Sequence, residues 1–166
     1  MIRAALLIAL VVLAGCAAPG FHTGGSCSLA AADEMQVQLV TRSDDGKRQV
    51  FLLNNHWQEQ RLSVVAMDPV GAVLFSGELA NAAISNKTSP LYRGVEPDLL
   101  LRVYGWWLQR DNRAPCWQGE GFSARQQADG SYRLSTSSLV MDWHPEQPEL
   151  IRLPRHGLQL VFTAVR

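Results

Sequence analysis

Short runs of alternating apolar and polar residues, separated by turn residues, restrict this chain to a β-rich fold. Residues 35–41 alternate between the two kinds of side chain, which is the period-2 pattern of a half-buried strand. Similar β-prone runs predict strands at 49–53, 62–67 and 72–79. The connections between them are too short for a parallel crossover, which needs a dozen or more residues. An antiparallel meander is therefore expected in the first half of the chain.

The second half of the chain repeats this character. Its predicted strands are 117–124, 131–135, 138–143, 150–153 and 158–165. Asp129 and Gly130 predict a tight hairpin turn between the first two of these strands. The last strand is expected to close or edge the sheet. Residues 81–90 are small and polar, and they are expected to form a loop.

One helix is predicted between the two strand-rich halves. Pro97 and Asp98 suit the first turn of a helix, and the apolar pattern continues to about residue 108. The apolar residues at helical spacing are Leu99, Leu100, Val103, Trp106 and Trp107. We expect a mainly β fold of the α+β class, with a curved open antiparallel sheet, or incomplete β-barrel, capped by this helix.

The apolar face of the predicted helix has two interpretations. It lines a cavity that holds an acyl chain, or it simply forms part of the hydrophobic core. Both interpretations bury Trp106 and Trp107, and only an open space between helix and sheet would distinguish them. The cavity interpretation gives the helix a second role, as a lid whose movement releases the ligand.

The first residues have the parts of a secretory signal. Arg3 precedes an apolar run over 4–12, which is followed by small residues. The run is too short to cross a hydrocarbon core of ~30 Å, which needs ~20 apolar residues. The sequence Leu13-Ala14-Gly15-Cys16 resembles the bacterial lipobox. This resemblance implies cleavage after Gly15 and acylation of Cys16, with palmitate among the expected chains. The alternative is an ordinary secretory signal with a chance cysteine.

These features divide the chain into a signal peptide over 1–15, a lipidated cysteine and flexible tether over 16–33, and one β-rich domain over 34–166. Each buried methylene contributes ~0.8 kcal/mol, so several acyl chains hold a protein on a membrane. In lipoproteins of this kind, an aspartate directly after the lipidated cysteine favours retention in the inner membrane. Residue 17 is alanine, so the resemblance implies the outer membrane. The domain is then expected on the periplasmic face of the cell envelope.

Two further cysteines follow Cys16. Disulfides persist outside the cytoplasm, and Cys27 and Cys116 are the pair that remains if Cys16 carries lipid. We expect a disulfide between them. Two separate thiols are the alternative.

Charge and motifs argue against several other classes of protein. The formal net charge is zero, and no cluster of Lys and Arg along the sequence indicates a nucleic-acid partner. The chain has no Gly-x-Ser-x-Gly elbow and no Gly-rich phosphate loop, and its histidines lack metal-ligand spacing. Asp142 and His144 form only a weak Asp-x-His pattern. We therefore expect no catalytic residues, no metal and no cofactor.

Three segments carry a resemblance to a known family. Residues 61–75, residues 89–108 and the strand after Gly157 resemble a family of uncharacterised bacterial lipoproteins, often encoded with aryl-polyene biosynthesis enzymes. That family is similar to the lipoprotein-localisation factors LolA and LolB, and the resemblance covers about residues 35–166. It implies an open β-barrel around an apolar cavity, an acyl chain or lipidated cargo as ligand, and a periplasmic carrier protein as partner. The alternative is a non-catalytic accessory lipoprotein that binds a protein partner through its sheet edge or helix face.

Overall fold

A computed structural model describes residues 35–58, 61–80, 83–110 and 123–165, which form one antiparallel sheet and one α-helix. The first five strands are β1 (Gln36–Ser43), β2 (Arg48–Gln58), β3 (Arg61–Met67), β4 (Val73–Ala80) and β5 (Ala83–Thr88). After them come the helix α2 (Pro97–Gln109) and the strands β6 (Ser123–Gln126), β7 (Tyr132–Ser135), β8 (Val140–His144), β9 (Gln147–Leu153) and β10 (Leu158–Val165), with a 3-10 turn η1 (Pro154–His156) before β10.

The ten strands form a single open sheet in the order β5-β4-β3-β2-β1-β10-β9-β8-β7-β6. Each half of the chain is a meander, and β10 joins the halves by pairing with β1 along eight residues of register. This corrects the expectation that the last strand closes or edges the sheet. In the described residues β5 and β6 are the edges and do not pair with each other, so the sheet is not a closed barrel.

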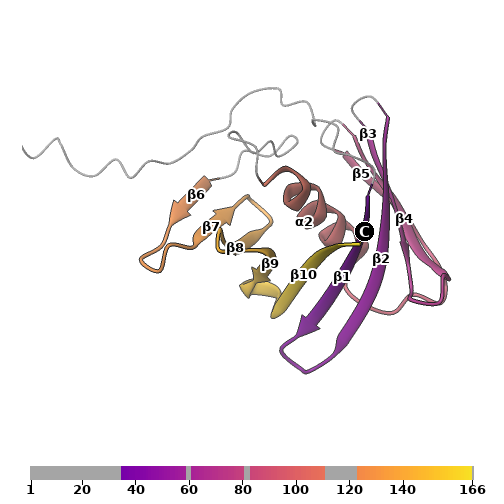
Figure 1. Ribbon diagram of the computed structural model, residues 1–166, viewed down its shortest axis with the longest axis horizontal. Coiled ribbons are helices and arrows are strands. Elements are labelled where there is room, and N and C mark those ends of the chain that lie inside the picture. The colour runs from indigo at the N-terminus through magenta and orange to yellow at the C-terminus, as the bar shows by residue number, and fades with distance from the viewer. Residues whose placement is uncertain (1–34, 59–60, 81–82, 111–122, 166) are drawn as a thin grey trace, which may run out of the picture.

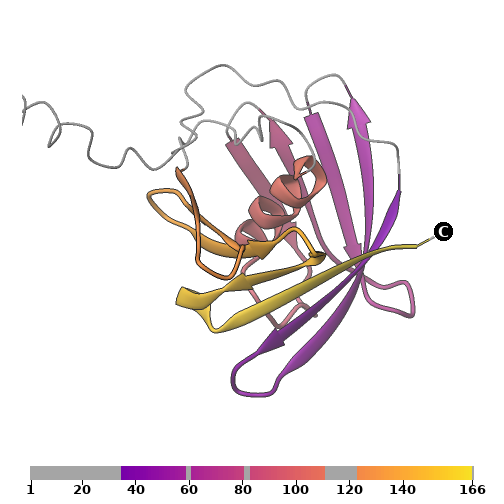
Figure 2. The same ribbon diagram turned by 60° about the vertical axis from the view of Figure 1, so that its left-hand side comes forward.

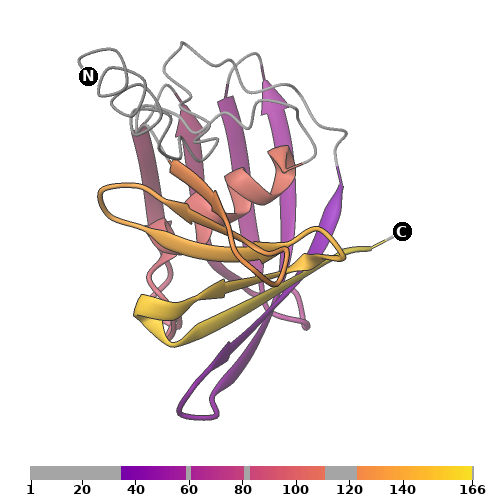
Figure 3. The ribbon, with the colours of Figure 1, turned by 90° about the vertical axis from the view of Figure 1, so that its left-hand side faces the viewer.

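The sheet bends around α2. Figure 1 shows the helix between the first and second meanders, and Figure 2 shows the sheet curling around it. In Figure 3, the strands of the second meander lie nearer the viewer than the helix and cross the direction of the strands of the first meander behind it. The hydrophobic core lies on this inner, concave face, where residues such as Leu39, Leu62 and Leu160 are fully buried.

Most of the predicted elements are confirmed. The strands near 35–41, 62–67 and 158–165 and the helix from Pro97 match the structure closely. The Asp129-Gly130 turn is also confirmed, because Gly130 has a φ of 83°, a conformation that favours glycine. The predicted strand at 117–124 is described only from Ser123 onward, where β6 begins.

The predicted loop at 81–90 is wrong, because residues 83–88 form the edge strand β5. Five of its six residues are exposed, and only Ile84 is partly buried. A strand at the sheet edge with almost no buried face shows no apolar alternation. Residues 83–88 form a strand because they pair with β4, for example Ile84 with Leu79.

Candidate functional site

The local sequence places α2 firmly against the first meander. Pro97 begins the helix, and Asp98 in the first turn accepts a hydrogen bond of 2.5 Å from the Asn86 amide of β5. Gly105 lies so close to β4 that an added Cβ would be 2.7 Å from Leu79 Cδ2. This glycine, unfavourable in an isolated helix, is therefore explained by the close approach of α2 to the sheet.

The structure brings the predicted helix residues into the space between α2 and the sheet. Leu100, Val103, Trp106 and Trp107 are buried, and Leu99 is partly buried. Leu101 and Tyr104, which the sequence-based reasoning left out, are each only 1% exposed. Because the sheet wraps round the helix, α2 is buried over a wider arc than a single amphipathic face. Leu101 and Tyr104 are three residues apart and therefore lie on the same side of the helix. This spacing could have predicted that a second side of α2 is buried.

Trp107 is the centre of a stacked aromatic cluster. Its ring lies 5.0 Å from Phe162 and 6.1 Å from Tyr104, with interplanar angles of 23° and 15°. The indole nitrogen donates to the Pro148 carbonyl at 2.9 Å, and the Arg110 guanidinium lies 4.1 Å from the ring centroid. These contacts make Trp107 a packed core residue.

Trp106 lies toward β7 and β8 instead, in a group that we call the aromatic rim, formed by Trp106, Trp143 and Tyr132. Trp106 meets Trp143 edge to face at 5.6 Å, and Trp143 lies 6.1 Å from Tyr132. Trp143 and Tyr132 are only partly buried, whereas inward residues of β1 such as Leu39 are fully buried. The Trp106 indole nitrogen is buried without a hydrogen-bond partner. The partial exposure of Trp143 and Tyr132 shows that the inner face is less well covered on β7 and β8 than on β1.

Two tyrosines are buried in the same interior. The Tyr104 hydroxyl donates to Asn55 Oδ1 at 3.4 Å, and the Asn55 amide nitrogen has no hydrogen-bond partner. Burial raises the pKa of Tyr104 well above its usual range. Burial also raises the pKa of Tyr92 to about 12, and the Tyr92 hydroxyl donates to the Val95 carbonyl. Burial therefore keeps both hydroxyls neutral to a higher pH than in an exposed tyrosine.

Other surface features lie away from the helix. An open hollow of about 920 Å³ lies between the β1–β2 hairpin, the η1 turn and the segment before α2. At the same end of the sheet, the side chains of Val70 and Leu91 are 89% and 75% exposed. Val70 lies at the tip of the β3–β4 turn, and exposed aliphatic tips of this kind are candidate contacts for a membrane or partner.

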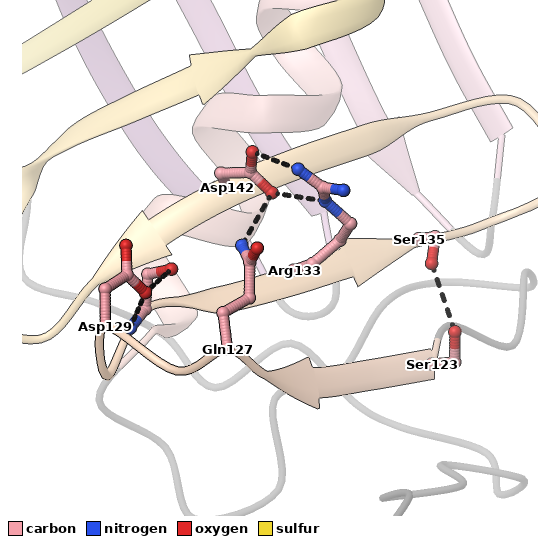
Figure 4. A network of polar contacts seen from close by, with 7 residues as sticks. Ser123, Gln127, Asp129, Arg133, Ser135 and Asp142 are labelled. Carbon is pink, nitrogen blue, oxygen red and sulfur yellow. Dashed lines mark hydrogen bonds and ion pairs between the residues drawn. The ribbon is translucent and has the colours of Figure 1, made fainter.

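Asp142 and His144 of the Asp-x-His pattern bind different partners. Asp142 accepts hydrogen bonds from Arg133 at 2.7 and 2.8 Å, shown in Figure 4, and from Gln127 at 3.4 Å. His144 instead contacts the Asp129 carbonyl at 3.1 Å and accepts from the Glu146 amide. Within the described ranges there is no cluster of His, Cys, Asp and Glu able to hold a metal ion.

The predicted lipidation and disulfide residues, Cys16, Cys27 and Cys116, lie outside the described residues, as do the signal peptide and the tether. In the part of the chain that is described, no helix combines the length and apolar character needed to span a bilayer. Comparison of the sequence with models of known protein families and with curated proteins finds no match.

Proposed function

We propose that this chain is an outer-membrane lipoprotein, anchored through Cys16, whose LolA/LolB-like domain binds an acyl chain or lipidated cargo on its inner face. The domain faces the periplasm and assists delivery of this cargo to the outer membrane. The ligand enters at the aromatic rim. A periplasmic carrier protein supplies it, and no cofactor takes part.

The observation that carries this proposal is the incomplete covering of the inner face. Trp143 and Tyr132 point to the same side of the sheet as the core, yet remain partly exposed. They adjoin Trp106, so an apolar surface continues from the buried interior to these partly exposed rings. Each methylene moved from water onto such a surface contributes ~0.8 kcal/mol, and eight methylenes would supply ~6 kcal/mol. This is enough for reversible capture of a chain without any specific polar contact.

Fluorescence titration with cis-parinaric acid tests the ligand. The probe is excited directly, so the number of tryptophans does not affect the signal, and the full chain is used with Cys16→Ser to keep it off the membrane. We expect saturable binding that is at least tenfold weaker in Trp143→Glu. The control is Val65→Glu, which places the same charge at a partly buried position of β3 on the outer face. Binding to the control should stay within twofold.

Absence of saturable binding by the folded chain would contradict the proposed ligand. Equal weakening in Trp143→Glu and Val65→Glu would contradict the rim as its place of entry. The anchor is tested separately. Globomycin should cause a precursor to accumulate, and Cys16→Ser should release the protein from membranes. A Cys16→Ser chain that stays membrane-bound would contradict lipidation at this residue.

A further inference from the structure

The strand register places arginines side by side on the outer face of the sheet. Residues that pair directly across neighbouring strands point to the same side. One continuous series of such pairs crosses the sheet from β2 to β6. Its members, in order, are Arg48, Arg42, Gln159, Arg152, Asp142, Arg133 and Arg125. We call the five arginines Arg48, Arg42, Arg152, Arg133 and Arg125 the arginine row. Seven strands at ~4.8 Å spacing give the row a length of ~29 Å.

The arginine row lies opposite the core. Its neighbours in sequence, such as Thr41, Ile151 and Leu134, are buried on the inner face, whereas all five arginines are exposed. Figure 4 shows Arg133 and Asp142 on the side of β7 and β8 away from α2. The row holds five of the chain's 15 Lys and Arg residues, in a protein whose formal net charge is zero. Positive charge is therefore concentrated on this face.

The charges of the row are mostly unpaired. Asp142 is the only acidic residue in the series of pairs that forms the row, and Arg133 donates a hydrogen bond to each of its two carboxylate oxygens. Among the described residues, Arg42, Arg48, Arg125 and Arg152 form no ion pair. Arg42 and Arg48 lie directly opposite each other, an arrangement that destabilises a sheet. This pairing leaves two cationic groups side by side, where an anionic partner would relieve their repulsion.

A second row, of aliphatic residues, runs beside the arginines. Val50 pairs with Val40, Val40 with Val161 and Val161 with Leu150, so these four side chains cross β2, β1, β10 and β9 on the outer face. Val50, Val161 and Leu150 are partly exposed, whereas Val40 between them is only 9% exposed. We call this set the aliphatic row. The two rows give the outer face one basic and one apolar stripe, parallel to each other.

We propose that these two rows bind an acidic amphipathic segment of a partner protein. Its carboxylates meet the arginine row, since a guanidinium binds a carboxylate through two parallel hydrogen bonds, as Arg133 and Asp142 do here. Its apolar side chains cover the partly exposed members of the aliphatic row, Val50, Val161 and Leu150. The segment lies across the strands from β2 to β9, and β7 and β6 extend the basic stripe beyond it.

Two other anionic partners fit the face less well. The row follows the bend of the sheet, in which β7 to β9 cross the direction of β2 to β4, so a flat bilayer would reach only part of it (Figure 3). A nucleic-acid backbone carries phosphates but has no aliphatic groups to cover Val50, Val161 and Leu150, which are partly exposed. A flexible protein segment can follow the curve and supply both kinds of group.

Binding to poly-L-glutamate and to a random Glu–Leu copolymer of the same length tests the proposal. We expect the full chain with Cys16→Ser to bind the copolymer more tightly than poly-L-glutamate. The double variant Arg42→Gln/Arg152→Gln should weaken both at least tenfold. The control, Arg61→Gln/Lys87→Gln, removes two charges from the outer faces of β3 and β5, and should weaken binding less than twofold. Circular dichroism verifies that both variants are folded.

Equal weakening in the two double variants would overturn the proposal, because it would indicate unspecific charge attraction. Row-dependent binding to vesicles with 30% phosphatidylglycerol, or to duplex DNA, in place of the polypeptides would also overturn it. The inner face is unchanged in Arg42→Gln/Arg152→Gln, so cis-parinaric acid should bind this variant normally. Loss of the parinaric signal from the unsubstituted chain would refute the lipid proposal alone and would leave this one standing.

Discussion

Truncation of Trp107 to alanine measures how firmly α2 is packed into the sheet. The side chain is 5% exposed, stacks on Phe162 and Tyr104, and donates a hydrogen bond to the Pro148 carbonyl. Removing a buried tryptophan costs ~3–5 kcal/mol through lost transfer free energy and the cavity that remains. The Pro148 carbonyl keeps the Trp143 indole as a donor at 3.4 Å, so it is not left unpaired. We therefore expect a loss of ~4 kcal/mol.

Urea unfolding, followed by circular dichroism on the Cys16→Ser chain, gives this free energy, provided that the m-value is unchanged. The control is Trp57→Ala, since Trp57 is only partly buried and lies on β2 beside the helix–sheet interface. We expect it to lose less than half as much stability. A loss below ~1.5 kcal/mol for Trp107→Ala would refute the tight packing of α2 and would favour a loosely held, mobile helix.

Three further predictions follow from single features of the chain. Gly105→Val should lower the free energy of unfolding by ~2–3 kcal/mol, because the new side chain collides with Leu79 and a β-branched residue disfavours the helix; a smaller loss in the Leu79→Ala background would identify the collision as the cause. Stability should fall as the pH rises from 10 toward 12, because the folded state raises the pKa of Tyr92 to about 12 and keeps it neutral, and Tyr92→Phe should flatten this part of the urea midpoint curve. Alkylation of the denatured, unreduced chain should modify neither Cys27 nor Cys116, and peptide mapping that finds both alkylated would exclude the predicted disulfide.

Local pattern was enough to predict most elements. β1 and β10 alternate because one face of each packs on the core, and the beginning of α2 is marked by Pro97 and Asp98. The position of β10 was not predictable in this way. A strand at the centre of a sheet and one at its edge can carry the same alternation, and only the pairing of β10 with β1 and β9 decides between them.

The candidate sites depended even more on tertiary pairing. The helix residues near Trp106 and Trp107 could be named from their spacing, but Trp143 and Tyr132 join them only because β7 and β8 fold over α2. The arginine row has no counterpart in the linear sequence, where Arg48, Arg152 and Arg125 are far apart. It exists only once the register of seven strands is known.

The burial of α2 limits how the domain can release a ligand. Six large side chains of the helix are buried: Leu100, Leu101, Val103, Tyr104, Trp106 and Trp107. Exposing each of them would cost ~1.5–3 kcal/mol, or ~9–18 kcal/mol together, which is comparable to the ~5–15 kcal/mol that stabilises a typical domain. Lifting α2 as a lid would therefore amount to unfolding. The proposed ligand would instead exchange at the aromatic rim, where Trp143 and Tyr132 are already partly exposed.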